Sequence, residues 1–458
     1  MSVTSFARRY GGEKAEPLWW GPGDDAPRHV RDGNAKPAAT PMTTRRRVVV
    51  TGLGVVAPNG IGKDVFWTSL VAGKSGIGPI TLFDASKYPC RIAAEISNFR
   101  PQTFMLPARV KHRGRFSQLA VAAAKLALQD SGLDLKKVRA DRVRIAMGTS
   151  MAGFGDVGDT VQAGFAKAGF EGIPTVSALE IAAHAPVAHV STELGLKGQA
   201  LTLGSACTTG IDAIAWAATQ IADGYADVAL AGATDAPLAE LSYASLSALG
   251  ILTKYVGQPS KASRPYDLHR DGMVLGEGAA VVVLEERDTA ISRGGTLYAE
   301  VLGYGCGNEG GYGPRTDTAE NALSDAIGTA LGGAGLLGQD IDHINAHGNG
   351  LPDYDLVETR AFKQALGAHA YNIPINSIKS MIGHAMGAAS AIQVAAACLT
   401  IKHGIIPPTV NLDTPDPECD LDYVPLKARV ARVRRVLLNA HAMGGTHSVM
   451  ILGAPTTR

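Results

Sequence analysis

The sequence predicts a layered α/β fold made of two similar halves. Short apolar strands alternate along the chain with segments whose apolar residues recur at helical spacing, a pattern typical of sheets covered by helices. In each half, a strand leads into a polar turn that carries a reactive side chain, and an Ala-rich helix follows that turn. This repeated order indicates a duplicated α/β unit with a site between its halves.

The first half contains five expected strands and two expected helices. One helix ends at Gly132, a residue type favoured just after helix C-termini. In the other helix, the apolar positions from Ile211 onward follow the i, i+3, i+4, i+7 spacing. The strands are expected within residues 48–51, 142–150, 200–206, 227–236 and 278–286, and the helices within residues 117–133 and 211–222.

The second half has the same alternation of strands and helices. One expected strand enters the loop around His347, and another enters the turn before His384. Helices are expected over residues 319–336 and 385–404, and strands within residues 341–348, 373–384 and 446–454. We therefore divide the chain into an extension over residues 1–45, a first half over residues 46–295 and a second half over residues 296–458.

Composition and charge argue against several classes of protein. The net charge of +1 over 458 residues gives no electrostatic basis for binding nucleic acid or an anionic membrane. The five cysteines are an odd number without a CxxC pair, which argues against a disulfide framework or a structural zinc site and for the reducing cytoplasm. The longest apolar stretches, residues 201–222 and 381–401, are rich in Gly, Ala and Ser, so we expect buried helices rather than membrane spans.

The first 45 residues differ from the rest of the chain. They are rich in Pro, Gly and charged residues and show no periodicity, so we expect a disordered extension. They contain no apolar core typical of a secretory signal. Met42 directly precedes the segment where ordered sequence is expected to begin, which makes it a candidate start of the chain.

The glycines after the first expected strand resemble a dinucleotide-binding turn. Gly52 and Gly54 match the first two positions of GxGxxG, but Ala57 stands at the third. No acidic residue is identified at the end of a second strand. The sequence therefore argues against an NAD site.

Cys207 lies at a junction between an expected strand and an expected helix, in the segment GSACTTGIDAI. At the N-terminus of a helix, free N–H groups and the helix dipole favour a thiolate over a thiol. A free cysteine is also commonly a small buried residue of the core. Position alone leaves both interpretations open for Cys207, whereas Cys398 lies in the middle of an Ala-rich helix and is expected in the core.

Two histidines and a lysine in the second half are further candidates. His347 lies where a strand gives way to a Gly-containing loop, which lets a side chain project into a cleft. Its HxxxH spacing with His343 resembles a zinc motif, but the segment is not helical and lacks the glutamate of HExxH, so we expect no metal there. Lys379 and His384 lie five residues apart at the start of a helix, and the apolar neighbours of Lys379 favour a buried, paired ammonium.

The Gly-Gly loop in NAHAMGGTHSVMIL is the last candidate, because such a loop is suited to presenting backbone N–H groups to an oxyanion. A thiolate nucleophile, two imidazoles and backbone donors together favour acyl-thioester chemistry. The thiolate would take an acyl group, and the neutral imidazoles would donate hydrogen bonds to a thioester carbonyl that becomes an enolate. This hypothesis gives Cys207 the reactive role.

From about Arg46 to the end, the sequence resembles the β-ketoacyl-[acyl carrier protein] synthases, the condensing enzymes of type II fatty-acid and polyketide biosynthesis. The segments that carry the resemblance occur in the order usual for the family: VVVTGLGVVAPNG, ACTTG, SRPYDLHRDGMVLGEGAA, INAHGNG, KSMIGHAMGAAS and GGTH. The resemblance implies a thiolase-like fold, in which two similar α/β halves form a five-layered αβαβα sandwich. It also implies an acyltransferase that works as a dimer.

The resemblance further implies roles for individual residues. Cys207 would accept the acyl group, His347 and His384 would promote decarboxylation of a malonyl thioester, and Lys379 would condition the site. No cofactor is implied, because the phosphopantetheine arm arrives on the acyl carrier protein. The partner subunit would be a second copy of the chain or a ketosynthase-like chain-length factor.

The sequence departs from the family in the loop after His347 and in the helix after His384. The loop usually carries two threonines that bond the phosphopantetheine arm, and this chain has Asn349 and Leu351 instead. Asn349 can still form such a bond, whereas Leu351 cannot. The helix usually carries a glutamate at the position of Gln393.

Two further departures concern the expected acyl pocket. The family gate is usually a Phe flanked by glycines, and this chain has Met443 followed by Gly444. Ser117, next to Phe116, stands where fatty-acid enzymes often place a bulky residue that closes the pocket. The acyl substrate therefore need not be a standard saturated fatty acyl chain.

Two other functions are compatible with this fold. A chain-length-factor-like subunit would only shape a tunnel in a heterodimer, but such partners characteristically lack the cysteine. A coenzyme A thiolase uses a second cysteine in a Gly-rich C-terminal loop, and the segment AMGGTH has none. The expectation is a condensing enzyme of unspecified acyl chain and pathway.

Overall fold

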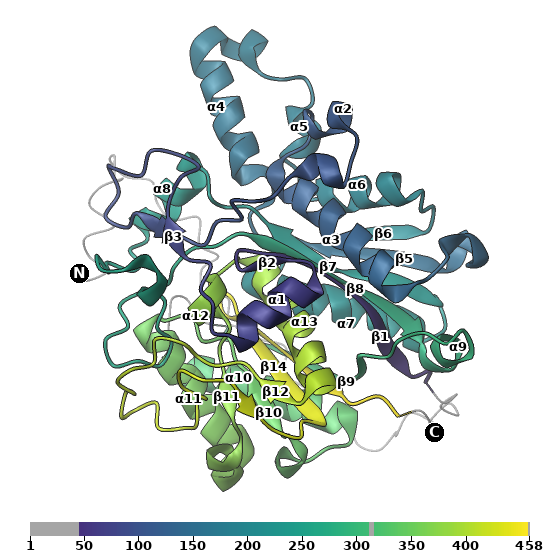
Figure 1. Ribbon diagram of the computed structural model, residues 1–458, viewed down its shortest axis with the longest axis vertical. Helices are drawn as coiled ribbons and strands as arrows, with labels where there is room; N and C mark the ends of the chain where they lie inside the picture. The colour runs from purple at the N-terminus through teal and green to yellow at the C-terminus, as the bar shows by residue number, and fades with distance from the viewer. Residues whose placement is uncertain (1–44, 311–315, 457–458) are drawn as a thin grey trace, which may run out of the picture. The chain divides into compact units, whose positions relative to one another are not determined.

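The computed structural model describes residues 45–310 and 316–456 (Figure 1). The expected extension lies outside the described residues except for Arg45, and so does the candidate start at Met42. Within the described ranges, no helix is long and apolar enough to cross a membrane.

Eleven strands of the described residues form one sheet. Their order is β11-β10-β14-β15-β9-β1-β8-β7-β5-β6, with β2 (Gly60–Ile61) paired to β1. The other strands of the first half are β1 (Val48–Ala57), β5 (Val143–Gly148), β6 (Gln199–Leu203), β7 (Val228–Asp235) and β8 (Gly278–Glu286). Those of the second half are β9 (Ala299–Asn308), β10 (His343–Asn345), β11 (Ile375–Asn376), β14 (Arg435–His441) and β15 (Thr446–Gly453).

The two halves of this sheet have the same topology. The five strands named above for each half can be numbered first to fifth along the chain. In both halves, their order across the sheet is then third, second, fourth, fifth, first. In both, the second strand is parallel to the third and fourth, and the fifth is antiparallel to its two neighbours. The halves meet where β1 pairs with β9. The predicted duplication is confirmed.

Helices on both faces of the two half sheets give five layers. α7 and α13 lie in the middle, α3 and α6 pack on the outer face of the first half, and α10 and α11 pack on the outer face of the second (Figure 1). These helices are α3 (Arg115–Ser131), α6 (Ala185–Leu194), α7 (Thr209–Ala222), α10 (Thr316–Ala334), α11 (Pro352–Leu366) and α13 (Gly387–His403).

The remaining elements lie mostly in connections, and all of them except α4 are short. The helices are α1 (Lys63–Val71), α2 (Pro107–Val110), α4 (Asp156–Ala168), α5 (Ser177–Glu180), α8 (Glu240–Ala248), α9 (Arg287–Ser292) and α12 (Lys379–Ile382). The strands are β3 (Gly78–Pro79), β4 (Ile92–Ala93), β12 (Ile405–Ile406) and β13 (Arg429–Val430).

Side chains that alternate along each strand supply the separate layers of the core. In β8, Val281 and Val283 belong to the apolar cluster beneath α3, whereas Val282 and Leu284 belong to the cluster around α7 and α13. This pattern explains why the strands read as continuous apolar runs: helices cover both of their faces.

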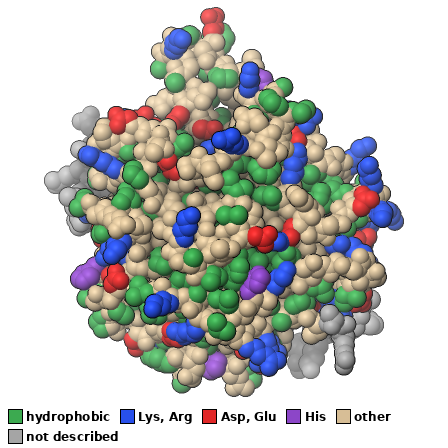
Figure 2. All heavy atoms as spheres, in the orientation of Figure 1, with side chains coloured by type: hydrophobic (Ala, Val, Ile, Leu, Met, Phe, Trp, Pro, Cys, Tyr) green, Lys and Arg blue, Asp and Glu red, His purple; other side chains and the backbone are tan. Residues whose placement is uncertain are grey.

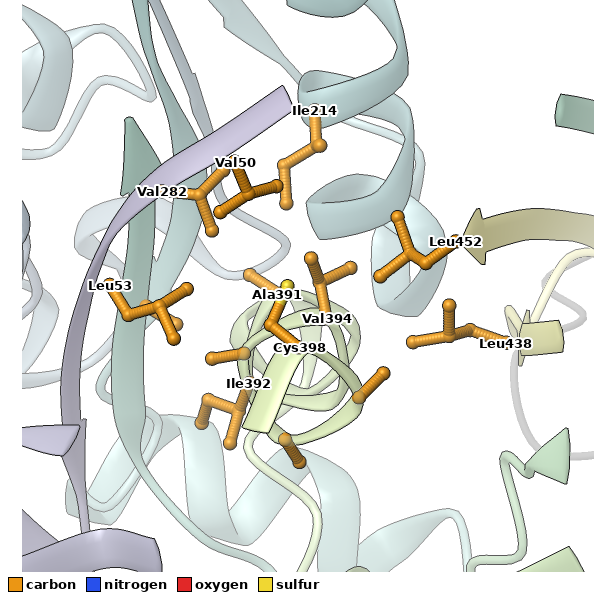
Figure 3. Close-up of a cluster of buried hydrophobic side chains, with 14 of the residues drawn as sticks. Val50, Leu53, Ile214, Val282, Ala391, Ile392, Val394, Cys398, Leu438 and Leu452 are labelled. Carbon is orange, nitrogen blue, oxygen red and sulfur yellow. The ribbon is translucent and has the colours of Figure 1, made fainter. Parts of the chain in front are cut away.

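α13 is buried from Gly387 to Thr400 because a half sheet lies on each side of it. Figure 3 shows residues of β1 and β8 on one side of α13 and residues of β14 and β15 on the other, namely Val50, Leu53, Val282, Leu438 and Leu452. Cys398 is fully buried in this cluster, as predicted. The Ala-rich composition of α13 therefore reflects a helix with no exposed face over most of its length.

The first strand is longer than predicted. Gly52 and Gly54 lie inside β1 rather than in a turn after it. A Cβ atom on Gly54 would lie 1.9 Å from the carbonyl oxygen of Ala123, and one on Gly52 would lie 2.3 Å from that of Ala127. The two glycines are therefore needed for the close packing of α3 on β1, and their spacing has no connection with a nucleotide.

The surface carries charges of both signs. On the face drawn in Figure 2, Lys and Arg side chains are interspersed with Asp and Glu side chains. This face therefore presents no extended basic surface, in agreement with the small net charge of the chain.

We predict that Gly210→Ala destabilises the protein by about 1–3 kcal/mol, because overpacking of a tight contact has this cost. The new Cβ would lie 2.3 Å from the backbone nitrogen of Ala391, where α7 meets α13. Urea unfolding measures the change. Gly328→Ala is the control: its Cβ meets open space on α10, and the gain in helix propensity should stabilise by about 0.5–1 kcal/mol. Equal stability of the Gly210 variant and the parent would contradict the tight contact.

Candidate active site

The structure brings Cys207 and His384 together from equivalent places in the two halves. Cys207 follows the third strand of the first half in a short turn, Ala206–Thr208, and α7 begins directly after it. His384 lies between the third strand of the second half and α13. The two central helices therefore each begin beside one reactive side chain.

The turns before both helices contain backbone conformations that non-glycine residues rarely adopt. Ala206 has φ 53° and Met386 has φ 50°. Such strain costs of order 1–3 kcal/mol at each residue and is kept only where the surroundings hold it. The carboxylate of Asp235, at the end of β7, supplies one restraint, since it accepts the backbone N–H groups of Gly387 at 2.7 Å and Met151 at 2.9 Å.

The sulfur of Cys207 lies 3.2 Å from Nε2 of His384, and each side chain is only 2% exposed. Burial raises the pKa of Cys207 to about 12 and lowers the pKa of His384 well below its ordinary value. The resting pair is therefore a thiol and a neutral imidazole. Burial thus opposes the thiolate that the helix N-terminus was expected to favour, and the charge of Lys379 and backbone hydrogen bonds to the sulfur offset it only in part.

His347 lies beside this pair, with its ring centroid 5.2 Å from that of His384. The backbone N–H of His441 donates to Nδ1 of His347 at 3.2 Å. Burial lowers the pKa of His347 well below its ordinary value, so the ring is neutral and carries its single proton on Nε2.

Asn349 lies next to that proton. Its side-chain amide is 3.2 Å from Nε2 of His347, and its Oδ1 accepts the backbone N–H of Leu351 at 3.0 Å. The N–H of His441 leaves Nδ1 of His347 as an acceptor, so the single proton of a neutral ring belongs on Nε2, and a substrate oxygen takes the place of the Asn349 amide there. Nε2–H of His347 is thus a donor that a substrate oxygen can use.

Lys379 is 1% exposed, as expected for a buried ammonium, and donates to the carbonyl oxygen of His347 at 2.6 Å and to Oε1 of Gln393 at 3.0 Å. Burial lowers the pKa of Lys379 to about 8. The amide nitrogen of Gln393 donates to the carbonyl oxygens of Ala346 and Asn439. A glutamate at position 393 would replace the amide nitrogen with a negative oxygen, which would repel these carbonyl oxygens. The amide of Gln393 therefore fits this site better than a carboxylate.

Met443 and Gly444 lie in the loop between β14 and β15. The backbone of Met443 hydrogen-bonds to the sulfur of Cys207, and the side chain of Met443 packs against the apolar cluster that contains Cys207 and Met386. Gly444 has φ 119°, a conformation that suits glycine. The loop therefore presents a backbone donor at the nucleophile, as expected.

Phe116 and Ser117 lie elsewhere in the first half. Both are buried on α3, and Phe116 belongs to the cluster beneath that helix rather than to the cluster with Cys207. Ser117 lies beside the carboxylate of Glu180. The structure does not bring these two residues into contact with the catalytic candidates.

The sequence analysis missed two buried carboxylates on α11. Glu358 accepts the backbone N–H groups of His347 at 2.7 Å and Gly348 at 2.9 Å. Burial opposes its charge, but hydrogen bonds from His441 and its other donors lower the pKa of Glu358 to about 2. Asp355 accepts the backbone N–H of Asn349 at 3.1 Å, and burial raises its pKa to about 7. Their i, i+3 spacing just after the His347 loop was the signal that could have found them.

Comparisons with known proteins agree with this geometry. Residues 45–290 match the family model "Beta-ketoacyl synthase, N-terminal domain", and residues 298–413 match "Beta-ketoacyl synthase, C-terminal domain".

The chain belongs to the beta-ketoacyl synthase family.

Relatives of this synthase come from both fatty-acid and polyketide pathways. The tetracenomycin polyketide synthase ketoacyl synthase alpha subunit of Streptomyces glaucescens is 41% identical over 90% of this chain and 97% of that protein. The 3-oxoacyl-[acyl-carrier-protein] synthase 2 of Coxiella burnetii is 38% identical over 89% of this chain and 98% of that protein.

Solved structures agree with the five-layered, thiolase-like fold of the synthase. The ishigamide ketosynthase/chain length factor matches with a TM-score of 0.84 and 35% identity, covering 90% of this chain and all of that one. A type II polyketide synthase ketosynthase in complex with its acyl-carrier protein matches with a TM-score of 0.83 and 32% identity, over the same shares. The family consists of acyltransferases, so the synthase is an enzyme of that class.

We predict that condensation by the synthase slows as the pH rises through about 8. The ammonium of Lys379 is retained below its lowered pKa and lost above it, and its charge favours both the thiolate of Cys207 and the neutral form of His347. The turnover number measured from pH 6.5 to about 9.5 checks this.

Lys379→Met should be slower and should lack the alkaline decline. Lys136→Met, at an exposed position, should keep the parent profile. An alkaline decline that persists unchanged in Lys379→Met would show that another group titrates.

Proposed function

We propose that the synthase extends an acyl chain held on Cys207 by decarboxylative Claisen condensation with malonyl-[acyl carrier protein]. The observation that carries the proposal is the contact of 3.2 Å between the buried sulfur of Cys207 and Nε2 of His384, beside the Nε2–H of His347. This arrangement suits a nucleophile with an adjacent base and a separate donor for an enolate oxygen. The pathway is the biosynthesis of a fatty acid or a type II polyketide.

In the first half-reaction, Cys207 takes the acyl group. The sulfur forms a bond with the thioester carbonyl carbon while His384 Nε2 takes the thiol proton. The backbone N–H groups of Cys207 and Met443 stabilise the oxyanion. The bond to the carrier sulfur then breaks, and the proton on His384 passes to the leaving thiolate.

Before the second half-reaction, His384 exchanges its single proton from Nδ1 to Nε2 through solvent. Malonyl thioester then binds with its carbonyl oxygen at the Nε2–H groups of His347 and His384. The bond to the carboxylate breaks and releases CO2, and the electron pair forms an enolate held by the two imidazoles. The enolate carbon then bonds to the acyl carbon, and the sulfur of Cys207 leaves with its electron pair. Taking up one proton restores the thiol, so each condensation consumes one proton.

Two residues prepare the site for the substrate arm and its charges. Lys379 places a positive charge that favours the thiolate leaving group, and its bond to the carbonyl oxygen of His347 holds the loop that carries the imidazole. Asn349 offers a polar group beside Nε2 of His347, where one of the family's threonines usually contacts the phosphopantetheine arm. The arm arrives with the carrier protein, and the proposal needs no cofactor or metal.

The proposed assembly is a dimer formed by two copies, or by this chain and a chain-length factor. β6 is the edge strand of the sheet, and its residues Gln199, Ala200 and Leu201 are exposed. Exposed apolar side chains lie in the segment before β6: Phe154, Phe165, Phe170, Leu179 and Ile181. A bare edge and exposed apolar side chains are typical of surfaces that are covered in an assembly. We place the enzyme in the cytoplasm.

We expect Cys207→Ala to abolish acyl loading and condensation, since the variant has no sulfur to accept the acyl group. Cys398→Ala should retain both activities, because Cys398 lies in the core beside no other candidate residue. Intact-protein mass spectrometry after incubation with acyl and malonyl carrier proteins reads the loaded species and the product length. Loading that survives in Cys207→Ala would remove the proposed mechanism.

Ser117→Phe should exclude long acyl chains if the helix around it borders the acyl tunnel. Overpacking costs ~1–3 kcal/mol, or about a 5- to 150-fold loss for long chains relative to short ones. Loading rates for butyryl and dodecanoyl carrier proteins, compared at equal folded fraction, check the ratio. An unchanged ratio with lower stability would place Ser117 in helix packing instead.

A further inference from the structure

Three side chains that the proposed chemistry does not use form a hydrogen-bonded chain beside His347. Nε2 of His447 is 2.9 Å from Oε1 of Glu309, and Nδ1 of His447 is 2.9 Å from Nδ1 of His441. The two histidines are 1% and 2% exposed, and the carboxylate side chain is 14% exposed. We call Glu309, His447 and His441 the histidine chain.

Asn439 and Glu358 meet the inner end of the histidine chain at His441. The amide nitrogen of Asn439 donates to Oε1 of Glu358 and lies 3.1 Å from Nε2 of His441. Turning this amide around would place its oxygen against the carboxylate, so the nitrogen donates to both groups. Nε2 of His441 also lies 3.4 Å from Oε1 of Glu358, and this contact helps to lower the pKa of that carboxyl.

The protons of the two outer contacts follow from the carboxylate of Glu309, which accepts, and from the neutral ring of His447. Nδ1–H of His441 donates to Nδ1 of His447, and Nε2–H of His447 donates to Glu309. Burial, and then the neighbouring His441, lower the pKa of His447 to about 3, so the ring stays neutral and its Nδ1 remains an acceptor. The donors therefore run outward from Nδ1–H of His441 through His447 to the partly exposed carboxylate of Glu309.

The histidine chain closes the base of the β14–β15 hairpin. His441 and His447 are opposite each other in the register of the two strands. The loop between them carries Met443, whose backbone contacts the sulfur of Cys207. Glu309 also bonds to this loop, since its backbone N–H donates to the carbonyl oxygen of Gly445 at 2.9 Å.

The same hairpin sets the tautomer of His347. The backbone N–H of His441 is the donor to Nδ1 of His347, and the two ring centroids are 5.0 Å apart. If β14 shifted at its last residue, Nδ1 would lose its donor and the ring could place its proton there. Nε2 would then have a lone pair toward the thioester oxygen and could not donate to the enolate.

We propose that His441, His447 and Glu309 are positioning residues for condensation: they hold the end of β14 so that His347 keeps its proton on Nε2. This inference rests on the proposed function, because it assigns a use to that proton. It separates the two half-reactions. Loading depends on Cys207, His384 and the backbone N–H of Met443 in this hairpin, whereas decarboxylation depends in addition on the tautomer of His347.

The test compares His447→Leu with His447→Asn in the full chain. His447→Leu removes the acceptor for Nδ1–H of His441. We expect the turnover number for malonyl decarboxylation to fall at least about tenfold, with a clearly smaller loss of loading and the KM for malonyl carrier protein within about twofold. In His447→Asn, Oδ1 of the new side chain replaces Nδ1 of His447 as the acceptor for His441, so we expect decarboxylation within about threefold of the parent. His112→Leu, at an exposed position, is the control for loss of a histidine.

The outcomes separate the inference from the proposed function. Parent enzyme that neither loads nor decarboxylates would overturn the proposed function itself. Two outcomes would overturn the positioning role alone. One is unchanged decarboxylation in His447→Leu, and the other is an equal loss of loading and decarboxylation in both His447→Leu and His447→Asn.

Glu309→Ala supplies a second test in case the Leu variant does not fold. It removes only the outer acceptor, so a loss of decarboxylation of about threefold with normal loading supports the role, and parent rates in this variant contradict it. Glu309→Gln keeps an acceptor oxygen and should match the parent.

Discussion

The contact between α7 and α13 is the constraint on which the site depends. The two helices approach so closely that Gly210 has no room for a Cβ atom beside Ala391. Each helix begins at a turn with strained backbone, so their separation determines how far Cys207 lies from His384. Because the two half sheets enclose this helix pair, core packing maintains the distance of 3.2 Å between the sulfur of Cys207 and Nε2 of His384.

Burial then decides the electrostatics of the site. Cys207, His347 and His384 are neutral because desolvation disfavours their charged forms. Glu358 keeps its charge because backbone N–H groups and other donors surround it. Lys379 donates to two neutral oxygens, which leaves its ammonium less stabilised than a salt bridge would. The chemistry therefore starts from uncharged partners and moves protons only when a substrate arrives.

The layered fold could be predicted from the sequence, because strand and helix periodicity is a local signal. The turns and the family motifs singled out Cys207, His347, Lys379 and His384, which the structure brings into one buried site. The direction of the pKa of Cys207 could not be predicted, since desolvation depends on the residues that cover the turn. Gly52 and Gly54 were misplaced because a helix distant in sequence packs on their strand. His441 and His447 gave no signal either: their pairing depends on the register of a hairpin with an irregular loop.

The protonation state of Cys207 also determines which electrophiles react with it. Thiolates are the forms that peroxides and alkylating agents attack, and susceptibility follows thiolate character and exposure. Cys207 has little of either, whereas Cys306 lies exposed on β9. The sulfur of Cys207 becomes reactive only when a compound enters the buried site and places an acyl carbon beside it, where His384 can take the thiol proton. The burial that raises the pKa of Cys207 thus also lowers both properties that make a cysteine susceptible to oxidants.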